Sequence, residues 1–249
     1  MIVMIVGTYV RHFRKVSSTN SIAAAMLKEQ APAEGTVITA SYQESGRGQP
    51  GNSWESESGK NLIMSVILYP VMVRPADQFI ISRMVALAVH DVVSKYTKNA
   101  SIKWPNDIYV NNDKIAGILI ENSIMGETLS SSVAGIGLNV NQIVFRSGAP
   151  NPVSLKQVTG TTHNLKAVKE EMMAALDRRY AMVSSGETAV LENEYQQLLY
   201  RAGEWHRYSD DNGEFEGMIE RVMADGMLSV RRRDGTSRLY AFREIDYIL

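Results

Sequence analysis

The sequence predicts an α/β fold, with a mixed β-sheet and helices packed against it, followed by a small all-β unit. Up to about residue 200, short apolar strands alternate with segments of helical spacing. One strand, "NLIMSVIL", is almost entirely apolar, as in strands that are buried on both faces. After Tyr200 the pattern changes to short strands separated by Asn-Gly and Asp-Gly turns. We therefore expect one domain over residues 1–202 and a small C-terminal β-barrel over residues 203–249.

Composition limits the class of protein. The chain has 249 residues, 45% of them hydrophobic, which is enough for a sizeable core. A membrane span is not expected, because no apolar run approaches the roughly 18 residues it needs. The net charge of −1 gives no basic field for nucleic acid or a membrane surface. The absence of cysteine excludes disulfides and thiolate chemistry and fits a cytoplasmic location.

The elements before residue 145 follow from local patterns. The apolar run at residues 2–6 precedes its charges, the reverse of a secretory signal, and predicts a buried first strand. A helix should begin after "SSTN", where Ser18 or Thr19 can cap it. Further along the chain we expect a strand over 36–40, a strand over 61–70, a helix over 77–96, two strands within 102–122 joined by an Asn-Asn-Asp turn, and a strand over 131–141.

The second half contains two helices and the all-β tail. Leu165, Val168 and Met172 begin one helical stripe, and Leu191, Tyr195 and Leu198 form another. These stripes are typical of core packing rather than of a cofactor site. The strands of the tail are "FEGMIERV", "GMLSVRRR", "SRLYAF" and "EIDYI".

The loop "ESGRGQPGNSW" carries the first candidate functional residues. Gly46 and Gly48 flank Arg47, and glycines let the backbone approach a ligand closely. A guanidinium offers a fixed fork of donors to a carboxylate or phosphate. Trp54 can stack on a flat ring. Taken alone, the loop is better explained as a solvated surface segment whose tryptophan folds back on the core, and no Walker or Rossmann glycine motif is present.

Two further segments raise similar questions. In "KWPND", Pro105 ends a strand, so that Asn106 and Asp107 can hold a hydroxyl or a metal-bound phosphate. Taken alone, the segment is better explained as a plain Pro-Asn-Asp turn. In "KIAGILIEN", Lys114 and Gly117 interrupt an apolar strand. The glycine can mark close approach of a ligand, or the pair can be an edge lysine with a bulge. Asn139 is another polar residue at a strand end, whereas the four histidines lack metal-ligand spacing.

Taken together and in order, these segments resemble the biotin–protein ligases, also called biotin–[acetyl-CoA-carboxylase] ligases or holocarboxylase synthetases. The motifs are S-S-T-N, Y-Q-x-x-G-R-G…W, K-W-P-N-D, K-x-A-G-I-L-x-E and G-x-G-x-N, between about Ser17 and Asn141. The resemblance implies a catalytic domain related to class II aminoacyl-tRNA synthetases and a C-terminal barrel. It also implies two half-reactions. Biotin and MgATP give biotinyl-5′-AMP, and the adenylate then acylates a lysine of a biotin carboxyl carrier domain of acetyl-CoA carboxylase or a related carboxylase.

The resemblance also implies roles for individual residues. Arg47 and Lys114 would be the catalytic cations, meeting the biotin carboxylate and the α-phosphate, and Asp107 would help to hold Mg²⁺. The expected biotin-binding residues are Ser18, Thr19, Asn20, Gln43, Gly46, Arg47, Gly48, Gln49, Lys114, Gly117 and Ile118. The expected ATP-binding residues are Arg47, Trp54, Lys103, Asn106, Lys114 and Asn139.

Two departures from the family pattern refine the expectation. Gln49 stands where the family loop commonly has a second arginine, which is associated with retention of the adenylate. We therefore expect either that the protein retains the adenylate less well or that another group supplies the positive charge of the missing arginine. The sequence begins shortly before S-S-T-N, so we expect a ligase without the N-terminal DNA-binding domain of bifunctional members. An exposed sheet edge would serve a homodimer or the carrier domain.

Two other functions remain as alternatives. A lipoate–protein ligase would share the fold and the adenylation chemistry, but the G-R-G loop with K-W-P-N-D favours biotin. A non-catalytic biotin or nucleotide sensor would keep the pocket but lack cations at the reacting atoms, whereas Arg47 and Lys114 are both present.

Overall fold

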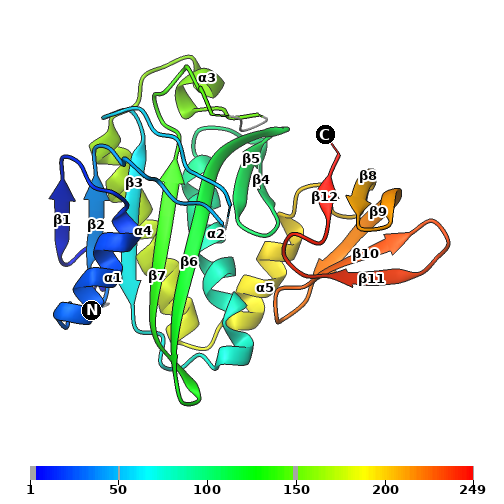
Figure 1. Ribbon diagram of the computed structural model, residues 1–249, viewed down its shortest axis with the longest axis horizontal. Helices are drawn as coiled ribbons and strands as arrows, with labels where there is room; N and C mark the ends of the chain where they lie inside the picture. The colour runs from blue at the N-terminus through cyan, green and yellow to red at the C-terminus, as the bar shows by residue number, and fades with distance from the viewer. Residues whose placement is uncertain (1–3, 50, 148–150, 249) are drawn as a thin grey trace.

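A seven-stranded mixed sheet forms the centre of the protein. The computed structural model describes residues 4–49, 51–147 and 151–248. The strand order is β1-β2-β3-β7-β6-β5-β4 (Figure 1). Its strands are β1 (Val10–Phe13), β2 (Val37–Ala40), β3 (Leu62–Leu68), β4 (Ala100–Lys103), β5 (Asp107–Val110), β6 (Asp113–Met125) and β7 (Thr128–Leu138). The β1–β2 pair is parallel and the other pairs are antiparallel, which confirms the predicted mixed α/β fold.

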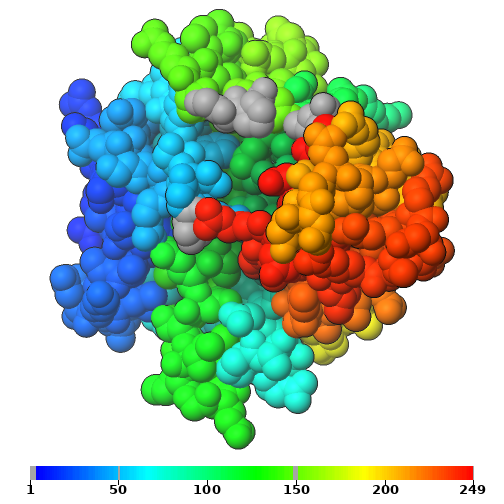
Figure 2. All heavy atoms as spheres, turned by 45° about the vertical axis from the view of Figure 1, so that its right-hand side comes forward, coloured from blue at the N-terminus to red at the C-terminus, as the bar shows by residue number. Residues whose placement is uncertain are grey.

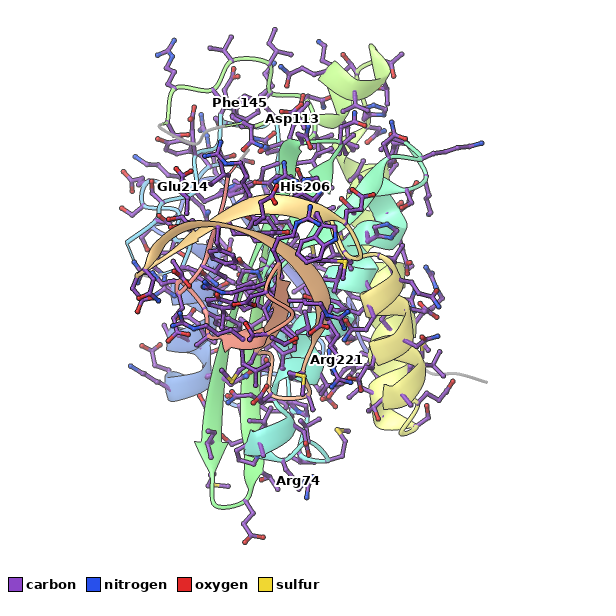
Figure 3. The ribbon with its side chains drawn as sticks, turned by 90° about the vertical axis from the view of Figure 1, so that its right-hand side faces the viewer. Arg74, Asp113, Phe145, His206, Glu214 and Arg221 are labelled. Carbon is purple, nitrogen blue, oxygen red and sulfur yellow. The ribbon has the colours of Figure 1, made fainter. Side chains whose placement is uncertain are left out.

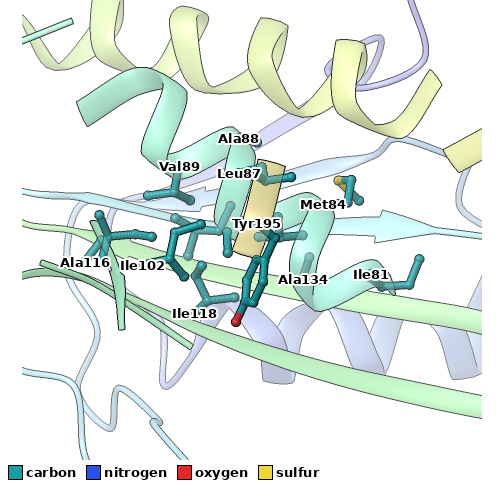
Figure 4. Packing of buried hydrophobic residues seen from close by; sticks show 14 of the residues in the cluster. Ile81, Met84, Leu87, Ala88, Val89, Ile102, Ala116, Ile118, Ala134 and Tyr195 are labelled. Carbon is teal, nitrogen blue, oxygen red and sulfur yellow. The ribbon is translucent and has the colours of Figure 1, made fainter. Parts of the chain in front are cut away.

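Helices cover both faces of this sheet. They are α1 (Thr19–Glu29), the 3₁₀ turn η1 (Pro75–Asp77), α2 (Phe79–Val93), α3 (Leu155–Thr159), α4 (Leu165–Ser184) and α5 (Thr188–Gln197). On one face, α2 is buried in all but two of its 15 residues, because α4 and α5 pack over it. Figure 4 shows this core around Met84, Leu87, Ile102, Ile118 and Tyr195. On the other face, Ala23 and Met26 of α1 pack on Ile38, Ile67 and Val133.

The start of the chain differs from the prediction. Residues 2 and 3 of the expected strand over residues 2–6 lie outside the described residues, and residues 4–6 form no strand. Val6 is fully buried, but the Ile5 and Val6 N–H groups donate to Asp177 Oδ1 at 2.7 and 2.9 Å instead of to a neighbouring strand. The apolar pattern thus indicated burial correctly only for Val6, since Met4 is 49% exposed. A carboxylate from α4 satisfies the backbone that a strand partner would otherwise satisfy.

Three strands, rather than the two expected, occupy the region after residue 100. Trp104, Pro105 and Asn106 separate β4 from β5, so that Lys103 pairs with Asp107 across a tight hairpin. A second turn at residues 111–112 then leads into β6. The proline that was expected to end a strand therefore sits in a turn between two strands, and the flanking Lys103 and Asp107 are cross-strand partners.

The C-terminal part forms a second, antiparallel sheet. Its strands are β8 (Trp205–Asp210), β9 (Gly213–Val222), β10 (Leu228–Arg232), β11 (Ser237–Tyr240) and β12 (Asp246–Tyr247), in the order β11-β10-β9-β8-β12. Figure 3 faces this sheet, with His206 on β8 and Glu214 on β9. Gly213, Gly226 and Gly235 have φ of 103°, 95° and 86°, as the predicted Asn-Gly and Asp-Gly turns require. The polar β8 was not predicted.

Specific hydrogen bonds attach the second sheet to the first domain. Arg83 of α2 is only 3% exposed, and its Nη2 donates to the carbonyls of Val222 and Met223 at 3.0 and 2.7 Å. Trp104 Nε1 donates to Gly226 O at 2.8 Å. Because these contacts fix the turn between β9 and β10, the C-terminal segment has a defined position beside the β4–β5 hairpin. Within the described ranges, no helix combines the length and apolarity of a membrane span.

His90 on α2 gives a prediction about stability. It is 9% exposed, and burial lowers its pKa below the ordinary value. The unfolded chain therefore binds a proton more readily, and the free energy of unfolding should fall as the pH drops from about 6.5 toward the lower folded pKa. Urea titrations at about pH 7.5 and about pH 5.5 measure this fall. It should be smaller in His90→Gln; an equal fall in both proteins would contradict the assignment.

Candidate functional site

A cavity of about 500 Å³ lies on the face of the large sheet that α1 covers in part. Figure 2 shows this hollow between the blue-to-cyan N-terminal part and the orange-to-red C-terminal part, with green strands beneath. Its lining includes most of the residues that the sequence selected: Ser18, Thr19, Asn20, Gln43, Arg47, Gly48, Gln49, Trp54, Lys103, Asn106, Asp107, Lys114, Gly117 and Ile118. Gly46 and Asn139 do not line it.

One end of the cavity is a buried cluster of hydroxyl and amide groups. Gln43 Oε1 accepts from the N–H of Thr19 at 2.7 Å and from its hydroxyl at 3.2 Å. Ser65 Oγ lies 2.7 Å from Thr19 Oγ1 and 2.6 Å from Asn20 Oδ1. Ser18 occupies the N-cap position, but its side chain makes no capping bond, so Gln43 performs the role expected of Ser18 or Thr19. This end can recognise a ligand head that has both donors and acceptors.

Arg47 lies at the cavity in an ion pair that the sequence did not predict. Its Nη2 is 2.5 Å from Glu121 Oε2, which also accepts from Asn20 Nδ2 at 2.7 Å. Both charged side chains are more than 40% exposed, so solvent screens the pair and its net contribution to stability is small. An anionic ligand can therefore compete with Glu121 for the guanidinium. Glu121 is the last residue of the K-x-A-G-I-L-x-E motif, so the motif itself could have marked it as a site residue.

Lys114 is the second cation of the cavity, and it stands on β6. That strand lies between β5 and β7, so Lys114 is not an edge lysine. The register between β5 and β6 shifts next to Tyr109, the partner of Lys114, as a bulge produces. The ammonium then lies 2.6 Å from Asp107 Oδ1 and 5.9 Å from the centre of the Trp54 ring. The bulge therefore directs a charge toward the cavity.

Two facing glycines make room for Trp54. Gly117 on β6 and Gly137 on β7 are direct cross-strand partners. A Cβ on Gly137 would lie 2.4 Å from Trp54 Cε2, and a Cβ on Gly117 would lie 2.9 Å from Trp54 Cζ3. Gly117 was expected to allow a ligand to approach the strand closely. In the structure it is the Trp54 indole of the glycine-rich loop that does so. Trp54 Nε1 is buried without a hydrogen-bond partner among the described residues, so this position of the ring leaves a donor unused.

The opposite end of the cavity includes the C-terminal segment. Lys103 Nζ lies 4.6 Å from the centre of the Tyr247 ring and 5.1 Å from that of Tyr109. Burial lowers the pKa of Lys103. The cavity lining also contains Arg243, Ile245 and Asp246. Nothing in the local sequence of the tail indicated these residues, because their position depends on how the second sheet attaches.

Three predicted residues have structural contacts that bear on their roles. Asn106 Nδ2 donates to Ile118 O at 2.6 Å, which fixes the hairpin against β6. Asn139 Nδ2 donates to Val153 O at 3.1 Å, away from the cavity, so its assignment to the nucleotide remains a prediction. Gly46 O accepts from Trp54 N at 2.9 Å and closes the loop. In the part of the chain described, no three Asp, Glu or His side chains cluster as a metal site would require.

The chain is similar in sequence to a family of protein ligases. The model of the biotin/lipoate A/B protein ligase family matches residues 12–139. The bifunctional ligase/repressor BirA of Bacillus spizizenii is 27% identical over 243 residues, covering 95% of this chain and 74% of that protein. The biotin–[acetyl-CoA-carboxylase] ligase of Paracoccus denitrificans is 29% identical over 224 residues, covering 87% of this chain and 92% of that protein.

Solved structures extend the similarity to the fold of almost the whole chain. A biotin protein ligase from Aquifex aeolicus, in complex with biotin and ATP, superimposes with a TM-score of 0.78 at 23% identity, covering 96% of this chain and 98% of that one. A biotin protein ligase from Leishmania major, in complex with biotinyl-5-AMP, has a TM-score of 0.67 at 20% identity, covering 94% and 99%.

Proposed function

The chain belongs to the biotin/lipoate A/B protein ligase family, and from that premise we propose that it is a biotin–protein ligase. It activates biotin with ATP as biotinyl-5′-AMP and transfers the biotinyl group to a lysine of a biotin carboxyl carrier domain. The observation that carries the proposal is the convergence of Arg47, Lys103 and Lys114 from three separate segments on one cavity. Two relatives named as ligases, one of them a biotin–[acetyl-CoA-carboxylase] ligase, match at least 87% of the chain, which supports the proposal.

The first half-reaction explains the need for these cations. A carboxylate oxygen of biotin attacks the α-phosphorus of ATP, the bond from that phosphorus to the bridging oxygen breaks, and pyrophosphate leaves. Both reactants are anionic, so the main requirement is a site that holds the negative charge in the transition state. Arg47 and Lys114 are the groups that we assign to this task. Their carboxylate partners, Glu121 and Asp107, keep them at the cavity before substrates bind.

The two ends of the cavity fit the two substrates differently. The ureido group of biotin has donors and acceptors, and the cluster of Thr19, Asn20 and Gln43 supplies both. The polyanionic nucleotide fits the end that contains Lys103 and Asn106. Mg²⁺ commonly binds one or two protein carboxylates together with substrate phosphates, so Asp107 is a suitable single ligand even without a metal cluster. When bound, Mg²⁺ would neutralise phosphate charge.

The second half-reaction requires the adenylate to survive until the carrier arrives. The lysine amine attacks the acyl carbon, the bond between acyl carbon and phosphate oxygen breaks, and AMP leaves. Because water would hydrolyse this mixed anhydride, the site must be covered. Loop residues 47–49 and 52–54 line the cavity, and a backbone bridge joins Arg47 to Ser53. We assign this loop the role of that cover.

The remaining partners follow from the same function. The carrier would belong to acetyl-CoA carboxylase or a related carboxylase, and the reaction would occur in the cytoplasm. The strand β1 is an edge of the large sheet, so it could accept either a carrier domain or a second copy of the chain.

A direct assay tests the function. The purified protein is incubated with biotin, ATP, Mg²⁺ and a carrier domain, which is then probed with streptavidin. Labelled carrier and released pyrophosphate are expected. Label transfer from lipoate but not from biotin would instead identify a lipoate ligase, and ligand binding without pyrophosphate would identify a sensor.

The position of Trp54 gives a spectroscopic prediction. The indole lies on Gly117 and Gly137 and lines the cavity that we assign to biotin and ATP. Binding of biotin with ATP should therefore move the ring and change the tryptophan emission. Titration of the wild type against Trp54→Phe isolates this signal from Trp104 and Trp205. An unchanged wild-type spectrum at saturating ligand would show that the ring does not move.

A further inference from the structure

Glu55 joins the glycine-rich loop, residues 46–54, to residues 142–147 in the connection between β7 and α3. The Arg146 N–H lies 2.9 Å from each oxygen of its carboxylate, and the Ser147 N–H donates to Oε2 at 2.5 Å. The Gln142 amide donates to Oε1 at 3.2 Å. One side chain therefore binds the backbone of a segment that lies about 90 positions further along the chain.

A buried amide strengthens the same junction. Gln142 is 1% exposed, and its Oε1 accepts from the Glu57 N–H at 2.8 Å and from Asn61 Nδ2 at 2.6 Å. Its own amide also donates to Val144 O at 2.9 Å, within residues 142–147. The stretch that follows the glycine-rich loop and the stretch that follows β7 are therefore held together at several points, of which Glu55 is the nearest to the loop.

Two parts of the β7–α3 connection contact segments that we assign to the reaction. Glu55 directly follows Trp54, whose ring lines the cavity. Further along the connection, the Lys114 N–H donates to Asn151 O at 2.7 Å, and the Val153 N–H donates to Lys114 O at 2.9 Å. The connection thus binds next to the covering loop at one place and on the backbone of the catalytic lysine at another.

The charge of Glu55 suits it to hold the two segments together. Partial burial would raise the pKa of its carboxyl group, but the N–H groups of Arg146 and Ser147 offset this effect and hold the pKa below its ordinary value. Hydrogen bonds to an ionised acceptor are roughly twice as strong as neutral ones. Glu55 itself does not line the cavity, so it can act on a ligand only through the loop.

We propose that Glu55 is a positioning residue that holds the glycine-rich loop over the adenylate by binding residues 142–147. This inference rests on the proposed function for the identity of the ligand. With the two segments joined, the loop opens only when the charge-assisted hydrogen bonds of Glu55 break. Without these bonds the loop opens more often, and the adenylate leaves before the carrier arrives. Formation of the adenylate changes much less, because Glu55 lies outside the cavity.

Hydrogen exchange measures the coupling of the two segments without any substrate. In Glu55→Gln, the amide keeps the size of the side chain but replaces one accepting oxygen with an NH₂ group. Peptides that cover residues 142–147 should exchange about tenfold faster, as for the loss of one charge-assisted hydrogen bond, and peptides that cover residues 46–54 should become faster with them. Faster exchange in residues 142–147 alone would overturn the inference, and so would wild-type exchange in both segments.

Escape of biotinyl-5′-AMP tests the consequence for the ligand. The adenylate is formed from biotin, ATP and Mg²⁺ without carrier, the free reagents are removed, and its release from the protein is followed. We expect release to be about tenfold faster in Glu55→Gln, while the single-turnover rate of adenylate formation stays within about twofold of wild type. Glu55→Asp keeps the charge and should recover part of the retention.

Glu57→Gln is the matched control, because it makes the same charge change at an exposed residue of the same stretch. It should exchange and release adenylate as the wild type does. Wild-type release from Glu55→Gln would overturn the inference, as would equally fast release from the control or an equal fall in the rate of adenylate formation. A wild type that forms no adenylate would refute the ligase, and hydrogen exchange would still decide whether Glu55 couples the two segments.

Discussion

Lys114→Ala is expected to reduce pyrophosphate release from biotin and ATP by a factor of about 10³, the upper range for losing one group that stabilises transition-state charge. The ammonium is 29% exposed and 2.6 Å from Asp107, so it is held at the cavity before any substrate binds. Because the developing charge on the α-phosphoryl group has no equivalent in the ground state, kcat should fall much more than KM rises.

The control for this variant must separate chemistry from folding. Removal of Lys114 leaves Asp107, which is 15% exposed, without its partner, and this can lower stability. Melting curves of Lys114→Ala and of Asp107→Asn measure that contribution. Lys166→Ala, at a lysine that is 78% exposed on α4, should retain wild-type activity. A kcat for Lys114→Ala within about twofold of wild type would remove Lys114 from the reaction.

The position of Lys114 illustrates what the sequence could predict. Lys114 and Gly117 interrupt an otherwise apolar strand, and this pattern indicated that the strand does more than pack in the core. The structure resolves this signal into a bulge beside Lys114 and a glycine pair beneath Trp54. Such local signals depend on residues that are close in sequence, so they can be read from the chain. The same holds for the turn glycines of the tail, whose positive φ follows from the residue type.

The parts that were missed depend on contacts between distant segments. Glu121 binds Arg47, which precedes it by 74 positions, and no local pattern encodes that pair. Gln43 replaces the expected helix cap because the end of β2 lies beside the start of α1. Arg243 reaches the cavity only because Arg83 and Trp104 fix the second sheet in place. The prediction of a strand at the start of the chain was wrong for a similar reason. Asp177 of the distant helix α4 accepts the hydrogen bonds of the Ile5 and Val6 N–H groups.

Arg47→Ala is expected to lower the rate of adenylate formation by a factor of about 10² to 10³, because the second cation at the reacting atoms is lost. The effect on stability should be small: the pair with Glu121 is half-exposed and screened by solvent. Single-turnover formation of biotinyl-5′-AMP measures the chemical step directly, and carrier labelling confirms the outcome. Arg47→Lys should recover only part of the rate, because it keeps the charge but loses the fork of donors.

Glu121→Gln distinguishes two explanations of an Arg47 defect. If Arg47 acts only through its ion pair, by holding Glu121 and hence Asn20 in position, then Glu121→Gln should be as damaging as Arg47→Ala. If Arg47 leaves Glu121 to meet the substrate anion, the neutral glutamine makes that exchange easier and the rate should change by less than about tenfold. We expect the second result. In Arg47→Ala the same glutamine substitution should then have little further effect, since the guanidinium that Glu121 retains is already absent.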